Sequence, residues 1–185
     1  MTDVLVRQTD RKQDQAAITT LRKALRGPLL QPADPGYAEA RAIWKAMIAK
    51  RPALIARVSG NADVVACVNF ARANGVPLSV RGGGHNVAGT ALCDGGLMID
   101  MSLRRGVRVD PDRRIVRVEG GATWGDVDHE TQPFGLVVPS GIVSDRGRGL
   151  HHGRRFWLDL AQVRVCRRQP RIGRHCDRRR RPSPR

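Results

Sequence analysis

The sequence predicts an α+β fold: a β-α-β unit, then short, mainly antiparallel strands, then a disordered or irregular Arg-rich tail. Up to about residue 80, segments with helical spacing of apolar residues alternate with short apolar runs, and further short apolar runs follow. Beyond Asp145 the sequence contains arginine pairs and has no clear hydrophobic periodicity. A parallel unit followed by antiparallel strands is typical of a fold with two layers or lobes. We divide the chain into a flexible leader, an N-terminal helical segment, a domain and a tail, at residues 1–15, 16–50, 51–145 and 146–185.

Two helices are expected in the N-terminal segment. Residues 16–25 have amphipathic spacing, and Gly27-Pro28 ends this helix. Residues 37–49 again carry apolar side chains three and four positions apart, which predicts a second, longer helix. The next apolar run, residues 52–58, is bounded by proline and by a Ser-Gly pair, and it predicts a buried strand.

The β-α-β unit continues from that strand. Asn61 can cap the next helix, and Gly75 supplies its C-terminal stop. Residues 76–80 form the second strand directly afterwards. Two strands joined through a helix in this way are parallel, with a right-handed crossover.

The later segments have a different character. Four short apolar runs have the composition of strands: 96–101, 106–110, 114–119 and 136–139. The turn Asp110-Pro-Asp-Arg113 joins two of them, so we expect a hairpin. Thr123 followed by Asp126 matches a capping box and predicts a helix between the hairpin and the last strand.

Charge separates the domain from the tail. The chain has 33 Lys and Arg against 17 Asp and Glu, a formal net charge of +16. Residues 1–145 account for +4 and residues 146–185 for +12. Such an excess suggests a nucleic-acid partner, but aromatic residues make up 4%, too few for a base-stacking platform. No apolar run suits a membrane span, no signal core precedes the domain, and four cysteines do not make a disulfide scaffold, so we expect a cytoplasmic protein.

The most informative segment is a glycine loop directly after a predicted strand. It contains Arg81, Gly82, Gly83, Gly84, His85, Asn86, Val87, Ala88 and Gly89. Successive glycines leave backbone N–H groups unshielded by a Cβ, so this loop can wrap an anion such as a pyrophosphate. It is neither a Walker A loop nor a dinucleotide fingerprint, because no helix-forming sequence follows. Taken alone, the glycines fit a tight turn without a ligand equally well.

This loop resembles the flavin-attachment loop of berberine-bridge-enzyme-like oxidoreductases, which are FAD-linked oxidases with a PCMH-type (vanillyl-alcohol-oxidase-like) FAD-binding domain. Other segments resemble the family in order and spacing: Leu25-Arg-Gly27, Pro35-Gly-Tyr37, Ala40-Arg-Ala-Ile-Trp44, Arg51-Pro-Ala-Leu-Ile55, Leu97-Met-Ile-Asp-Met-Ser102, Val118-Glu-Gly-Gly-Ala-Thr-Trp124 and Pro139-Ser-Gly141. The match covers about residues 24–145. It implies a PCMH-type fold and an FAD-dependent oxidoreductase that takes a hydride from an alcohol or sugar-like substrate, with O₂ as acceptor.

The resemblance also implies which residues hold FAD. His85 stands where the family bonds covalently to the flavin 8α-methyl carbon. A second link through a cysteine is not expected, because Ile142 and Val143 follow Gly141. The implied cofactor-binding residues are Arg81, Gly82, Gly83, Gly84, His85, Asn86, Val87, Gly89, Gly121, Pro139, Ser140 and Gly141. No catalytic residue is assigned, because the family's catalytic base lies in a C-terminal part that we expect this chain to lack.

Other reactive side chains have simpler explanations. Cys67 is expected to be a small buried thiol on a helix, Cys93 a structural thiol, and His129 a solvated or capping residue. Three potential metal ligands lie near the C-terminus: Cys166, His175 and Cys176. They lack the C-x-x-C spacing of a zinc site, so no metal is expected.

The tail departs from the family pattern, and a shifted reading frame explains this departure. After Asp145 the family continues with Thr-Gly-Val-Ala-Gly and a second glycine run, where this chain has Arg146-Gly-Arg-Gly149. Read one base later, residues 145–149 can encode Thr-Gly-Val-Ala-Gly, and residues 151–158 can encode Thr-Thr-Gly-Gly-Gly-Phe-Gly-Trp. We therefore expect the residues from about 146 to be out of frame, through a sequencing error or a real lesion, and the fragment to be inactive alone.

Two other functions stay open from the residues alone. The arginine runs could bind nucleic acid nonspecifically, and the domain could be structural and free of flavin. The family interpretation instead expects FAD as cofactor, an unknown small-molecule substrate, and neither a specific nucleic-acid partner nor a membrane partner.

Overall fold

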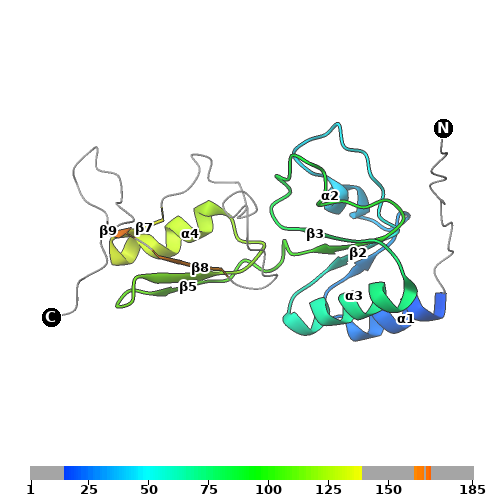
Figure 1. Cartoon of the computed structure of the whole chain (residues 1–185), viewed down its shortest axis with the longest axis horizontal. Coiled ribbons are helices and arrows are strands. Elements are labelled where there is room, and N and C mark those ends of the chain that lie inside the picture. The colour runs from blue at the N-terminus through cyan, green and yellow to red at the C-terminus, as the bar shows by residue number, and fades with distance from the viewer. Residues whose placement is uncertain (1–14, 139–160, 165, 168–185) are drawn as a thin grey trace, which may run out of the picture.

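The structure, a computed structural model, describes residues 15–138, 161–164 and 166–167, which form two lobes side by side (Figure 1). The N-terminal lobe contains α1 (Gln15–Ala24), β1 (Leu29–Leu30), α2 (Tyr37–Arg41), β2 (Leu54–Arg57), α3 (Asn61–Asn74), β3 (Leu78–Arg81) and β4 (Leu97–Asp100). The C-terminal lobe contains β5 (Val107–Asp110), β6 (Ile115–Val118), α4 (Trp124–Thr131), the 3₁₀ helix η1 (Gln132–Phe134), β7 (Leu136–Val137), β8 (Ala161–Arg164) and β9 (Cys166–Arg167). The predicted α+β class is confirmed.

The N-terminal sheet has the strand order β1-β2-β4-β3. Both β2 and β3 run parallel to β4, which lies between them, and β1 pairs antiparallel with β2. The two strands of the β-α-β unit are therefore parallel, as predicted, but they are not neighbours. The expectation that residues 96–101 join the antiparallel strands is wrong. All four residues of β4 are buried, and the unbroken apolar run Leu97-Met-Ile99 is typical of a parallel strand covered on both faces.

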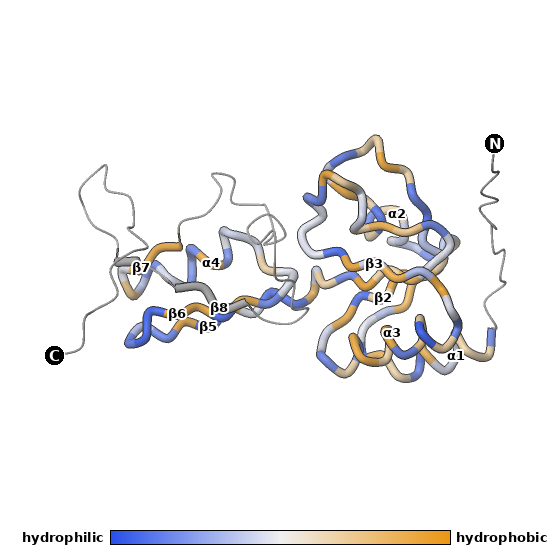
Figure 2. The backbone as a smooth tube through the Cα atoms, in the orientation of Figure 1, coloured by the Kyte–Doolittle hydropathy of each residue, from blue (hydrophilic) through white to orange (hydrophobic). Residues whose placement is uncertain are grey.

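The sheet separates two apolar clusters, because successive residues of a strand point to opposite faces. On the face covered by α1 and α3, the core contains Ile18, Leu21, Leu54, Ala56, Val64, Cys67, Phe70, Leu97 and Ile99. On the face covered by α2, it contains Tyr37, Ala40, Ile55, Leu92 and Met98. Figure 2 shows the hydrophobic strands between the helices and the α2 layer. Burying each large aliphatic side chain stabilises this sandwich by about 1.5–3 kcal/mol.

The second predicted helix is much shorter than expected. The sequence predicts a helix over residues 37–49, but α2 ends at Arg41, and Ala42 has an extended ψ of 131°. Past that point Ile43 and Ile48 still pack against the core, but Trp44 and Met47 are 67% and 89% exposed. Tertiary hydrogen bonds explain the difference, since the Ala42 carbonyl accepts from Arg81 and the Trp44 N–H donates to the Gly84 carbonyl. These backbone groups would otherwise bond within the helix.

The start of α3 also differs from the prediction. Gly60 occupies the N-cap and Asn61 is already helical, so Asn61 does not cap the helix. Asp63 satisfies the nearby backbone instead: its carboxylate accepts from the N–H groups of Ser59, at 2.9 Å, and of Arg26, at 3.2 Å. Gly75 ends α3 as predicted.

The C-terminal lobe contains the predicted hairpin. β5 and β6 pair antiparallel, and β8 extends the sheet on the other side of β6. Helix α4 packs on this sheet through a core of Val116, Val118, Ala122, Trp124, Val127, Leu136 and Val138. The capping box is confirmed, because Thr123 Oγ1 accepts from the Asp126 N–H and the Asp126 carboxylate accepts from the Thr123 N–H.

Two short strands fall within the tail that we expected to be irregular. β8 pairs with β6 and β9 pairs with β7, so the expectation does not hold for these six residues. The predicted shift of reading frame begins at residues that lie outside the described part, as do His175 and Cys176. None of the described helices is long and apolar enough to cross a membrane.

Candidate functional site

A row of three charged residues lies at the carboxyl ends of the parallel strands. The register pairs Arg57, at the end of β2, and Arg81, at the end of β3, with Asp100 at the end of β4. Three parallel strands that end in register place these side chains at one edge of the sheet. This is the edge at which open α/β sheets bind their ligands.

Asp100 is fully buried and is held by its neighbours on every side. Its Oδ1 accepts from Arg81 Nη1 and from the Ser102 N–H, both at 3.0 Å. Its Oδ2 accepts from Ser102 Oγ at 2.9 Å and lies 3.3 Å from Arg57 Nε, as an ion pair without the alignment of a hydrogen bond. Two guanidinium groups thus share one buried carboxylate, and one positive charge of the row is left uncompensated by Asp100.

Arg81 extends from this row to the glycine loop. Its Nη2 donates to the Ala42 carbonyl at 3.1 Å, and its guanidinium lies under Gly84, where an added Cβ would be 3.5 Å from Nε and Nη2. Gly84 has a φ of +75°, a conformation that disfavours other residues. Arg81 therefore joins the sheet edge, the segment after α2 and the glycine loop.

The glycine loop presents free backbone donors. Within the described part of the chain, the N–H groups of residues 82–86 have no hydrogen-bond acceptor. The loop is closed further on, where the Gly89 N–H donates to the Asn86 carbonyl and Asn86 Oδ1 accepts from the Thr90 N–H. A run of N–H groups without protein acceptors is the arrangement that binds anions such as phosphates.

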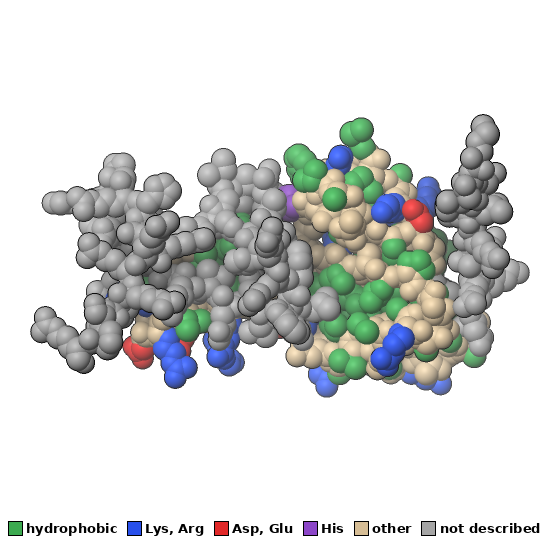
Figure 3. Space-filling model, in the orientation of Figure 1, with side chains coloured by type: hydrophobic (Ala, Val, Ile, Leu, Met, Phe, Trp, Pro, Cys, Tyr) green, Lys and Arg blue, Asp and Glu red, His purple; other side chains and the backbone are tan. Residues whose placement is uncertain are grey.

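His85 lies beside an aromatic ring. The Trp44 and His85 ring centroids are 6.2 Å apart, with the rings tilted by 30°. The hydrogen bond from the Trp44 N–H to the Gly84 carbonyl fixes this approach at 3.0 Å. Trp44 and Val87, which are 67% and 59% exposed, add apolar surface beside His85, and Figure 3 shows green side chains projecting from the same lobe.

A second loop, residues 119–122, meets the glycine loop from the other lobe. A Cβ added to Gly82 would lie 2.8 Å from the Gly120 carbonyl oxygen, so the two backbones are in contact here. Gly121 is packed still more tightly, because a Cβ there would lie 1.9 Å from the Met101 carbonyl oxygen. Residues 81–89 and Gly121, which are far apart in the sequence, are thereby brought together, as a shared cofactor site requires.

The structure also shows what sequence reasoning missed. Asp100 and Trp44 lie within quoted family segments, but nothing in the sequence indicated their contacts with Arg81 and His85. The signal for Asp100 was a carboxylate at the end of a fully buried apolar run, which marks the edge of a parallel sheet. Pro139, Ser140 and Gly141 lie outside the described residues.

The remaining candidates lie away from this edge. Cys67 is fully buried, and burial, reinforced by the nearby Asp63 carboxylate, raises the pKa of its thiol to about 12. Burial also raises the pKa of Cys93, whose Sγ lies 3.3 Å from Ser79 Oγ. His129 is exposed on α4, with Nδ1 3.1 Å from Glu130 Oε1. Among the described residues we find no cluster of three His, Cys, Asp or Glu side chains that could hold a metal ion.

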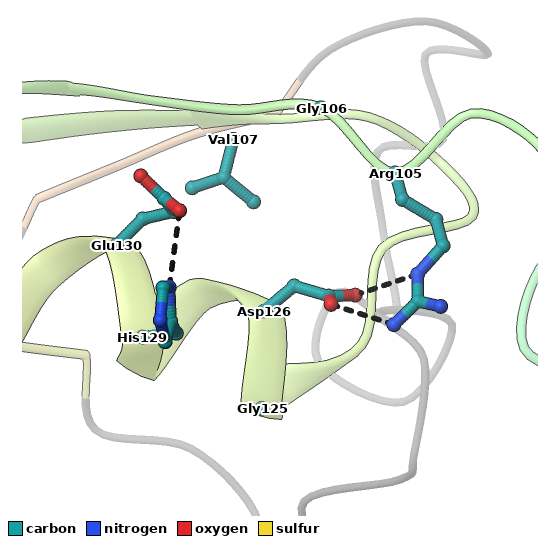
Figure 4. A pocket seen from close by; sticks show the side chains of 7 residues that line it. All are labelled: Arg105, Gly106, Val107, Gly125, Asp126, His129 and Glu130. Carbon is teal, nitrogen blue, oxygen red and sulfur yellow. Dashed lines mark hydrogen bonds and ion pairs between the residues drawn. The ribbon is translucent and has the colours of Figure 1, made fainter.

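An open hollow of about 550 Å³ lies between the start of β5 and α4 (Figure 4). The described residues that line it are Arg105, Gly106, Val107, Gly125, Asp126, His129 and Glu130. Arg105 donates two hydrogen bonds to the Asp126 carboxylate, at 3.0 and 2.6 Å, so these charged groups are already paired. None of these lining residues belongs to the predicted cofactor-binding set.

The edge around the glycine loop has the properties that FAD requires. The N–H groups of residues 82–86, which have no acceptor among the described residues, suit the pyrophosphate, and the Arg81 guanidinium lies beneath the same loop. Arg81 Nε is buried without a hydrogen-bond acceptor among the described residues, which is a further donor left unsatisfied at this place. The residues present therefore fit the cofactor.

Comparison with known proteins agrees with this chemistry. The family model described as an FAD binding domain matches residues 52–146. (R)-6-hydroxynicotine oxidase of Paenarthrobacter nicotinovorans is 36% identical over 119 residues, which are 64% of this chain and 26% of that protein. The chain thus spans about a quarter of the length of this curated relative.

Solved structures extend the comparison to the fold. The crystal structure of 6-hydroxy-D-nicotine oxidase from Arthrobacter nicotinovorans matches with a TM-score of 0.64 at 36% identity, covering 66% of this chain and 27% of that one. A berberine-bridge-enzyme-like protein of Physcomitrella patens shares the fold, with a TM-score of 0.66 at 22% identity, covering 71% of this chain and 29% of that one. This chain belongs to the PCMH-type FAD-binding domain family of berberine-bridge-enzyme-like, FAD-linked oxidoreductases.

Proposed function

We propose that this chain supplies the pyrophosphate-binding part of an FAD-linked oxidase, with FAD bonded covalently to His85. The observation that carries the proposal is the run of N–H groups in residues 82–86 that have no acceptor within the described part of the chain, beside a histidine at the carboxyl edge of a parallel sheet. The backbone there would bind the two phosphates, with Arg81 adding positive charge from beneath the loop.

Each residue of the site has a role that follows from its position. FAD, when bound, supplies the hydride acceptor for substrate oxidation. His85 would anchor the cofactor through a ring nitrogen, which is nucleophilic when neutral. Trp44 limits the space open to the imidazole on one side, and the lack of a side chain at Gly82 allows the two loops to approach closely enough to share one ligand.

The substrate remains a proposal of class only: an alcohol or a sugar-like compound that donates a hydride, with O₂ as the final acceptor. The hydroxynicotine oxidase relative adds 6-hydroxynicotine to the compounds worth testing. We propose further that the residues after about 146 are out of frame, so oxidase activity would require the displaced frame to be restored.

Flavin analysis of two products tests this function. One is the 185-residue chain. The other, the frame-shifted product, comes from a gene in which a one-base shift near codon 145 restores the reading frame that the family pattern predicts. Both are produced in flavin-replete cells, and their peptides are analysed by mass spectrometry. We expect the peptide containing His85 to carry flavin in the frame-shifted product, and a His85→Ala variant to lose the covalent flavin. His129→Ala, on the exposed face of α4, is the matched control and should keep it.

The outcomes separate the parts of the proposal. An unmodified His85 peptide in a product that contains flavin would refute the covalent link but not the cofactor. A complete lack of absorbance near 450 nm in both products would refute FAD binding. Substrate and acceptor are tested by aerobic and anaerobic turnover of the compounds named above, where equal rates without O₂ would exclude it as acceptor.

A further inference from the structure

We propose that Asp100 is a positioning residue of the flavin site: it holds Arg81, and Arg81 holds the glycine loop against the segment after α2. The inference rests on the proposed function, because that function gives the glycine loop its role. Asp100 itself lies beneath the site, fully buried, and acts only through the arginine.

The two arginines that share Asp100 differ in what else they contact. Arg57 donates its Nη2 to Ser102 Oγ at 3.3 Å, so its contacts stay at the ends of β2 and β4. Arg81 reaches out of the sheet, to the Ala42 carbonyl and to the underside of Gly84. The influence of the carboxylate on the loop therefore passes through Arg81, among the contacts that the structure describes.

The charge of Asp100 is essential to this arrangement. Its two oxygens face only donors: two arginines and the N–H and hydroxyl of Ser102. An asparagine would place an NH₂ group against some of these donors and would leave two guanidinium groups without a countercharge, which is costly for a buried pair. Without the ion pair to Asp100, the Arg81 guanidinium would no longer be held under Gly84.

Movement of Arg81 would disturb the loop at two places. The Ala42 carbonyl would lose its donor. The Arg81 guanidinium would also no longer link the segment after α2 to the glycine loop, which would weaken the hydrogen bond from the Trp44 N–H to the Gly84 carbonyl. The N–H groups of residues 82–86 would then lose their fixed arrangement, and the Trp44 ring would lose its fixed place beside His85.

Four variants of the 185-residue chain test the proposal: Asp100→Asn, Arg81→Gln, Arg57→Gln and Asp63→Asn. Arg57→Gln removes the other partner of the same carboxylate, and Asp63→Asn changes a second buried aspartate, which accepts from the N–H groups of Ser59 and Arg26 and has no described contact with residues 81–89. Affinities for FAD and for riboflavin, which lacks the pyrophosphate, are measured by flavin fluorescence. Hydrogen exchange of the Trp44 amide is followed by mass spectrometry without flavin.

We expect the ratio of FAD affinity to riboflavin affinity to fall roughly tenfold or more in Asp100→Asn and Arg81→Gln, the effect of losing charge-assisted hydrogen bonds. The ratio should stay within about threefold of the parent chain in Arg57→Gln and Asp63→Asn. Exchange of the Trp44 amide should accelerate in the first pair and not in the second. A general loss of stability would move all four variants together.

Each other outcome is decisive. Equal effects of Arg57→Gln and Arg81→Gln would overturn the proposal, since the carboxylate would then serve the sheet as a whole. So would an unchanged affinity ratio in Asp100→Asn. If the parent chain binds no FAD, the proposed function fails for this chain, and the Trp44 exchange alone supports or overturns the positioning role. If Asp100→Asn does not fold, the arginine pair decides.

Discussion

Replacing Gly121 with alanine should strongly destabilise the protein even when no flavin is present. An added Cβ would lie 1.9 Å from the Met101 carbonyl oxygen, 2.7 Å from the Met101 carbonyl carbon and 2.9 Å from the Arg104 carbonyl oxygen. All three atoms belong to backbone, which cannot rotate away as a side chain can. The Gly121 N–H also donates to the Arg104 carbonyl at 2.9 Å, and this bond holds the same loop.

The size of the effect follows from these contacts. The backbone must separate by about 1.5 Å to restore ordinary contact, more than most overpacked cores accommodate, and such strain costs about 1–3 kcal/mol or more. Loss of the hydrogen bond adds about 1 kcal/mol. We therefore expect the free energy of unfolding to fall by about 3 kcal/mol or more, a large part of the roughly 5–15 kcal/mol typical of a domain.

Gly60→Ala is the matched control, because its Cβ would meet nothing within 4 Å and its φ of −153° suits alanine. It should change the free energy of unfolding by less than about 1 kcal/mol. Both variants and the parent chain are unfolded in urea without flavin and followed by far-UV circular dichroism. Equal midpoints for Gly121→Ala and Gly60→Ala would refute the reasoning. Gly121 would then serve the approach of the cofactor, not the seating of its own loop.

Three further predictions concern single groups. Thr123→Ala removes the capping box of α4 and should lower the free energy of unfolding by about 1 kcal/mol, and with it the urea midpoint. An unchanged midpoint would show that the cap does not stabilise the protein. Burial acts to raise the pKa of Asp63, Glu119 and Asp126, but hydrogen bonds outweigh it and the pKa of each lies below its ordinary value. Their stabilisation is therefore complete above about pH 5 and is lost as the pH falls through the folded-state pKa values, so urea midpoints should decline below that pH, and a flat profile to pH 3 would contradict this. Because the pKa of Cys67 is raised to about 12, its thiol should react with a disulfide reagent at pH 8 only as fast as the protein opens, and reaction at the rate measured in urea would contradict its burial.

Local patterns were sufficient for much of the fold. Helix α1, the C-terminal end of α3, the hairpin at Asp110 and the capping box at Thr123 depend on contacts within a few residues, so the sequence predicts them well. The position of β4 was not predictable in the same way. Pairing between distant strands depends on the whole sheet, and a four-residue apolar run has no period that separates parallel from antiparallel neighbours.

The candidate site was predictable in part. Resemblance located the loop at residues 81–89 and Gly121, and the structure brings them together through the contact of Gly82 with the Gly120 carbonyl. It could not show where the Arg81 side chain points. The guanidinium is bonded to Asp100 and to the Ala42 carbonyl. Side-chain direction at a strand end depends on partners from other strands, which sequence spacing does not contain.

The largest failure of local reasoning, the helix expected over residues 37–49, lies against this same site. Its residues have adequate helical spacing, yet α2 stops at Arg41 because Arg81 binds the Ala42 carbonyl and Gly84 binds the Trp44 N–H. Breaking a regular helix and exposing Trp44 and Met47 both cost stability, and proteins accept such conflicts mainly where function requires them. The early end of α2 thus supports a site at this edge, because the non-helical segment that follows places the Trp44 ring beside His85. The charge of +12 on residues 146–185 lies almost entirely beyond the part of the chain that matches the FAD binding domain, so the function is better sought in the first 145 residues, whose net charge is +4.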